Sequence, residues 1–112
     1  MRVVFRNIRV LAVAGALTAA AIGLGGSAAL AADADHGAVL AKRWCAACHL
    51  VEPGQKQGST DAAPFDDIAH KPDFSPEKLA FFLLDPHPKM ANFPLNRLEA
   101  ADLAAYIASL RK

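Results

Sequence analysis

Hydrophobic and polar positions after residue 32 recur at helical spacing, in stretches separated by segments rich in proline and glycine. The last stretch shows one apolar face, formed by residues three or four positions apart: Leu103, Tyr106, Ile107 and Leu110. Asn96 precedes this stretch as the expected N-cap, and Glu99 can complete a reciprocal cap. The pattern predicts a C-terminal helix that buries one side.

Three further helices are predicted. One starts at Ser75 as the N-cap, with Pro76 at the first helical position, and ends at 85–86. A short one covers 65–69. The first helix runs into residue 45, with Asp35 as its expected N-cap. No stretch after residue 32 alternates with the period of a strand, so an all-α fold is predicted.

Two segments between the helices are expected to be irregular. Residues 51–64 contain a Pro-Gly turn signal and a polar run. Residues 85–94 contain three prolines, which make a stiff, extended loop. That second loop carries Met90 and Phe93, two residues that prefer burial. A rigid loop that presents one methionine inward suggests a ligand-bearing loop.

The N-terminal part has the pattern of an export signal. Three arginines within residues 2–9 precede an apolar run over 10–24, and small residues over 29–31 offer a cleavage site after Ala31. Residues 1–31 are therefore predicted to be a cleaved signal peptide, and residues 32–112 the folded domain of a periplasmic protein. The alternative is an uncleaved anchor, which needs ~20 apolar residues to cross a bilayer and would be the protein's only link to the membrane.

Removal of residues 1–31 changes the charge balance. The remaining 81 residues hold nine Lys and Arg against eleven Asp and Glu, a net charge of −2. No basic run or stripe survives, which argues against nucleic acid as a partner. A chain this short also buries little core by itself and usually needs a cross-link, a metal or a cofactor to be stable.

The strongest chemical signal is Cys45-Ala46-Ala47-Cys48-His49. Two thiols three positions apart can add to the two vinyl groups of a haem, and the adjacent histidine can then supply the proximal iron ligand. The alternatives are a disulfide after export, a thioredoxin-like redox pair, which requires a βαβ setting, and a zinc site, which requires four ligands.

The opposite iron ligand is expected to be Met90, the only methionine left after cleavage. A neutral thioether favours ferrous iron and raises the reduction potential. His87 and His70 are the rival ligands. Because two protein ligands leave no open position on the iron, the arrangement predicts electron transfer rather than catalysis. The protein is expected to be a free periplasmic carrier or the electron-transfer subunit of a respiratory dehydrogenase or oxidase. His49 also needs an acceptor for its other ring nitrogen.

These motifs resemble those of the class I monohaem cytochromes c. The resemblance covers residues 37–110 and implies three to four helices wrapped round one covalently attached haem c, with Gly37 where the first and last helices cross. It also implies that the carbonyl of Pro64 accepts a hydrogen bond from His49, and that the partners are an electron-donating and an electron-accepting redox protein. Ala91 stands where proline is common after the methionine. A gas-binding or peroxidase-like haem protein with a labile methionine is the alternative.

Overall fold

The computed structural model describes residues 30–85 and 88–112 of the 112-residue chain. Its elements in chain order are α1 (Ala34–Leu40), the π-helical segment η1 (Ala41–Cys45), α2 (Phe65–Ala69), α3 (Pro76–Leu84) and α4 (Arg97–Ser109). No strand occurs in these residues, as the all-α prediction expects. His87 and all but the last two residues of the predicted signal peptide lie outside the described ranges. No helix in the described part is long and apolar enough to span a membrane.

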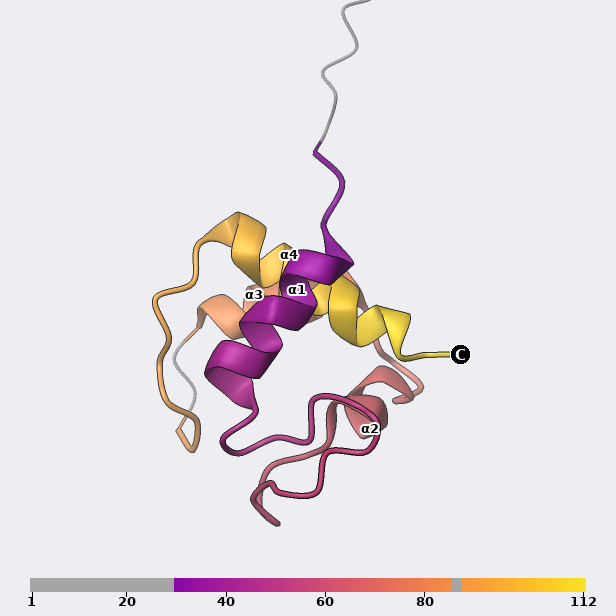
Figure 1. Ribbon diagram of the computed structural model, residues 1–112. Coiled ribbons are helices and arrows are strands. Elements are labelled where there is room, and N and C mark those ends of the chain that lie inside the picture. The colour runs from indigo at the N-terminus through magenta and orange to yellow at the C-terminus, as the bar shows by residue number, and fades with distance from the viewer. Residues whose placement is uncertain (1–29, 86–87) are drawn as a thin grey trace, which may run out of the picture.

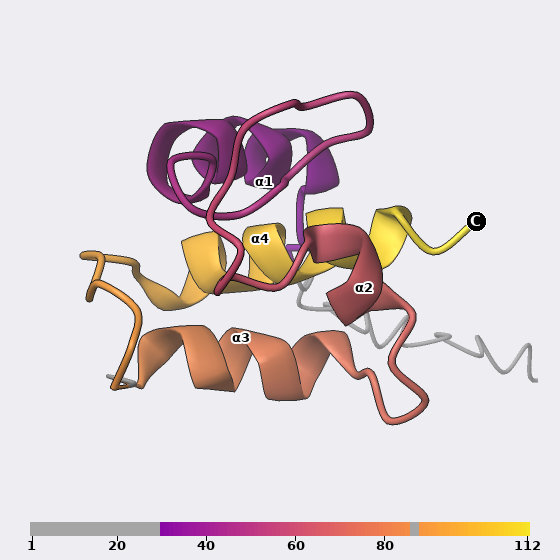
Figure 2. The same cartoon turned by 90° about the horizontal axis from the view of Figure 1, so that it is seen from below.

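The helix α4 is the centre of the fold. It lies between α1 on one side and α3 on the other, and α2 packs near its C-terminal half (Figure 2). The first and last helices cross (Figure 1), which places chain segments more than 60 residues apart in direct contact. The buried core is formed largely along this crossing and under the loop that follows η1. Its members are Leu40, Ala41, Cys45, Val51, Phe65, Ala69, Leu103 and Ile107.

The crossing point is Gly37, as predicted. Gly37 is buried, and a Cβ atom built on it would run into the backbone carbonyl of Asp102 and would lie 2.9 Å from the Cβ of Tyr106. Only a residue without a side chain lets the two helix backbones approach this closely. The helix-propensity cost of an interior glycine, ~1 kcal/mol against alanine, is therefore offset by the packing that the close approach allows.

The helix ends agree with the sequence with one exception. Ser75 caps α3 through Lys78 N, and Asn96 and Glu99 form the complete capping box of α4. The N-cap of α1 is Asp33, not the predicted Asp35. The carboxylate of Asp33 accepts from the backbone N–H groups of Asp35 and His36, both at 3.0 Å, so the helix starts two residues earlier. Asp35 instead adds negative charge to the first turn.

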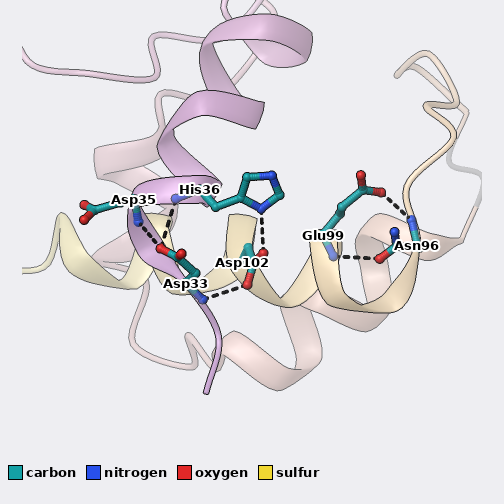
Figure 3. Close-up of polar contacts among 6 residues, drawn as sticks. All are labelled: Asp33, Asp35, His36, Asn96, Glu99 and Asp102. Carbon is teal, nitrogen blue, oxygen red and sulfur yellow. Dashed lines mark hydrogen bonds and ion pairs between the residues drawn. The ribbon is translucent and has the colours of Figure 1, made fainter. Parts of the chain in front are cut away.

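A polar cluster fastens the start of α1 to α4 (Figure 3). The carboxylate of Asp102 accepts from the backbone N–H of Asp33 and from Nδ1 of His36, both at 2.7 Å. The hydrogen bond to Asp102 raises the pKa of His36 above its usual value, and the negative charges of Asp102, Asp33 and Glu99 add to this effect. Protonated His36 therefore binds this cluster more strongly than neutral His36.

The stabilisation from His36 is expected to depend on pH. Because the folded-state pKa is raised, the charge contribution is complete below the ordinary value of 6.5 and is lost as the pH rises through the folded-state pKa. Chemical unfolding of the parent and of His36→Gln should differ more at about pH 5 than at about pH 8. In an Asp102→Asn background this pH-dependent difference should become much smaller, because only the weaker effects of Asp33 and Glu99 remain. A parent–variant difference that is equal at both pH values would contradict the assignment.

Candidate functional site

The two cysteines lie at the end of the first helical segment. In η1 the backbone N–H of Ala46 reaches the carbonyl of Ala41 at 3.0 Å, a five-residue step that widens the helix just before the motif. The carbonyl of Cys45 then accepts from the N–H groups of Cys48 at 3.1 Å and His49 at 2.9 Å. The motif is thus held in one compact turn, and its two cysteines are three positions apart in the chain.

The two thiols have different surroundings. Cys45 is buried against the core, whereas Cys48 is exposed, and neither forms a disulfide. Burial, with a smaller contribution from the nearby Cys48, raises the pKa of the Cys45 thiol to about 11. Because no disulfide joins them, both sulfur atoms can bond to another group. The described residues hold no group of three or more His, Cys, Asp or Glu side chains that could bind a metal ion, so the structure adds no support for a zinc site.

The imidazole of His49 is fixed through one ring nitrogen. Its Nδ1 lies 2.6 Å from the carbonyl oxygen of Ala63, and because a carbonyl can only accept, Nδ1 carries the proton. This tautomer leaves the lone pair of Nε2 for a metal. The acceptor is one residue earlier than the predicted Pro64. Pro64 is the N-cap of α2, and its carbonyl accepts from the N–H of Ile68 at 3.1 Å, which is the first hydrogen bond of that helix.

Aromatic contacts extend the support of His49 into the core. The ring of Phe65, the first residue of α2, lies 5.3 Å from that of His49 and 6.5 Å from that of Tyr106 on α4. The hydroxyl of Tyr106 donates to the carbonyl of Val51 at 2.8 Å. The segment that follows the motif is therefore attached to the central helix of the fold.

Gln55 is a supporting residue that the sequence did not single out. Its Nε2 lies 3.1 Å from the carbonyl of Ala46 and 2.8 Å from that of His49, and its Oε1 accepts from the N–H of Val51 at 2.9 Å. The side chain thus fixes the backbone at Ala46, at His49 and just beyond the motif at Val51. The signal available in the sequence is weak: Gln55 directly follows the Pro-Gly turn, whose Gly54 has a φ of 85°.

Met90 lies in the connection between α3 and α4. The side chain is half-buried although the segment is irregular, as the sequence predicts for this loop. The same connection contacts η1, because the ring of Phe93 lies 5.6 Å from that of Trp44. Of the rival ligands, His87 lies outside the described residues. His70 is exposed at the end of α2, with Nδ1 2.8 Å from the carbonyl of Asp66 in its own helix.

Similarity to a known protein identifies the family to which this geometry belongs. The chain is 65% identical over 91 residues to cytochrome c-552 of Bradyrhizobium diazoefficiens, an alignment that covers 81% of this chain and 88% of the relative. The chain belongs to the class I c-type cytochromes. No family model matches it. No solved structure gives a significant match.

Membership of this family makes the protein an electron-transfer protein with one covalently bound haem c, and the helices of residues 30–85 and 88–112 have the arrangement of the small cytochrome c fold. The residues present fit that cofactor. Cys45 and Cys48 offer two free thiols on one turn, and His49 offers Nε2 of a fixed tautomer. This donor set matches two thioether bonds and one axial imidazole.

Proposed function

We propose that this cytochrome carries single electrons between two redox proteins of the periplasm, with His49 and Met90 as the axial ligands of its haem iron. The observation that carries the proposal is the hydrogen bond from Nδ1 of His49 to Ala63, which leaves Nε2 for a metal. Met90 supports it as a half-buried side chain in a connection that contacts η1 through Phe93. When bound, haem c supplies a one-electron couple between ferric and ferrous iron. With His49 and Met90 both bound, the haem iron would have no position left for a substrate, which favours transfer rather than catalysis.

The role of the chain is to keep both ligands in place while the charge of the iron changes. On the histidine side, the Ala63 carbonyl holds the ring orientation, and the Phe65 ring packs beside it. Little has to rearrange when the oxidation state changes. On the methionine side, a neutral and polarisable thioether stabilises the ferrous form more than a second imidazole would, so Met90 raises the reduction potential.

The location and the partners form part of the proposal. The basic, apolar and small-residue regions of 1–31 support export followed by cleavage after Ala31. The mature domain then begins at Ala32 with a net charge of −2, before the haem propionates are counted. Transient electron-transfer complexes use small interfaces, so the donor and the acceptor are expected to bind briefly and to dissociate rapidly.

The test is a comparison of absorption spectra. The oxidised mature protein should show a weak far-red band from the sulfur–iron bond, and Met90→Ala should lose it. The potential of the variant should fall by on the order of 0.1 V, a fraction of the roughly 0.8 V range that axial ligands span. The rival-ligand variants His87→Ala and His70→Ala serve as matched controls and should keep the band.

Two outcomes would overturn this ligand assignment. A parent protein without the far-red band would exclude Met90 as the resting ligand. If His87→Ala then changed the ferric haem spectrum while Met90→Ala did not, the role would pass to that histidine. Reduced parent protein should not bind carbon monoxide rapidly. Rapid binding would instead support the alternative of a gas-binding protein with a labile methionine.

A further inference from the structure

A contact between two aromatic side chains joins the segments that carry the two proposed iron ligands. Trp44 directly precedes Cys45 in η1, and Phe93 follows Met90 by three residues. Their ring centroids lie 5.6 Å apart with the planes tilted by 49°. This is within the range in which aromatic pairs attract each other beyond the effect of area burial.

Both partners of this contact are held from their own side. The guanidinium carbon of Arg43 lies 4.8 Å from the centroid of the Trp44 ring, a cation–π contact that restrains the indole. Trp44 also packs against the buried core. Phe93 is half-buried although it belongs to no helix, and its carbonyl accepts from the N–H of Leu95 at 2.8 Å.

Residues 88–96 of the connection between α3 and α4 form no helix or strand. From residue 88 it runs beside the helices to the capping box at Asn96 (Figure 1). Pro88 and Pro94 limit its backbone freedom, since proline fixes φ. A point of attachment at Phe93 therefore restrains the position of Met90, because only two residues separate them.

We propose that the Trp44–Phe93 contact is a clasp that keeps the Met90 loop closed over the haem iron, and that Phe93 and Trp44 are positioning residues for the distal ligand. The proposal rests on Met90 being that ligand. The clasp links the loop to the same helical segment that carries the covalent attachment. If the clasp opened, Met90 would no longer be held at the haem, and an external ligand could take its place.

The test uses the ferric holoprotein with added imidazole as a competitor for Met90. Phe93→Leu and Trp44→Leu keep an apolar side chain but remove the aromatic pair. Each should raise the apparent affinity for imidazole about two- to tenfold, the factor that corresponds to the usual strength of such a pair. The double variant should resemble the stronger single variant, because both changes remove one shared contact.

The matched control is Phe81→Leu on α3. Phe81 is 79% exposed, so this variant makes the same phenylalanine-to-leucine change without affecting the Trp44–Phe93 contact. The imidazole affinity of this variant should equal that of the parent. Phe93→Tyr, which retains the ring, should restore parent-like affinity. Far-ultraviolet circular dichroism checks that each variant folds. If Trp44→Leu does not fold, the comparison of Phe93→Leu with Phe93→Tyr tests the clasp by itself.

The outcomes separate this inference from the proposed function. A parent without the far-red sulfur–iron band refutes His49/Met90 ligation, and the clasp is overturned with it. A parent that has the band, with an imidazole affinity equal in Phe93→Leu and Phe81→Leu, overturns the clasp alone. Effects of the two single variants that multiply in the double variant would also overturn it, because they would show two independent contributions.

Discussion

Replacing Cys45 and Cys48 together with serine is expected to abolish covalent haem attachment completely. Intact mass of the mature parent should equal the chain from residue 32 plus one haem, whereas the double variant should show no covalently bound haem. Each serine lacks the thiol that would add to a vinyl group, and in the structure no disulfide engages either cysteine. Haem staining after denaturing electrophoresis gives the same readout.

The loss should also reduce stability sharply. A folded domain of about 80 residues buries only a modest core, and a large apolar cofactor adds buried surface that binds the native state alone. The single variant Cys48→Ser provides the internal comparison, since it keeps the thiol of Cys45 and should retain one thioether bond. Haem that stays covalently bound in the double variant would contradict the assignment of the attachment site.

Gly37→Ala is expected to destabilise the protein by about 1–3 kcal/mol, the usual cost of forcing extra volume into a packed contact. The new Cβ would lie 2.5 Å from the carbonyl carbon of Asp102 and 2.9 Å from the Cβ of Tyr106. The first atom belongs to the backbone and cannot rotate away. The helices α1 and α4 must therefore separate, which loosens the core that their crossing buries.

The sign of this effect is the informative quantity. Helix propensity alone would make alanine more favourable than glycine by ~1 kcal/mol, so a stabilised variant would show that the crossing is not tight. Guanidinium unfolding followed by circular dichroism measures the difference. Val39→Ala is the control in the same helix, because Val39 is 61% exposed and its truncation should change the unfolding free energy little.

The helices and the chemistry of the attachment site follow from short-range features of the sequence. Ser75 and the Asn96–Glu99 capping box cap their own helices through neighbours three residues away, so their roles need no knowledge of the fold. The Cys-x-x-Cys-His motif is also local, since its atoms are brought together by one turn. Gly37 is predictable as a crossing point because a glycine inside a helix lowers stability unless it allows two backbones to approach closely.

The tertiary structure decided the features that depend on distant partners. The acceptor for His49 is the carbonyl of Ala63. The carbonyl of Pro64, which was the predicted acceptor, instead accepts from the N–H of Ile68 in the first turn of α2. Asp33 rather than Asp35 caps α1, in a position where Asp102 also binds its backbone N–H.

Contacts across long stretches of sequence leave no periodic signal. Trp44 and Phe93 are almost 50 residues apart, and neither shows by its position that the other is its partner. Gln55 occupies an ordinary polar loop, yet its amide fixes the backbone around the motif. The sequence by itself thus determined the helices, through interactions within a few residues, and it carried the Cys-x-x-Cys-His motif and the resemblance to the family, which the 65% identical relative shows. Only the folded chain decided how the segments that carry His49 and Met90 are held, because that depends on which distant groups the packing of α1, α3 and α4 brings together.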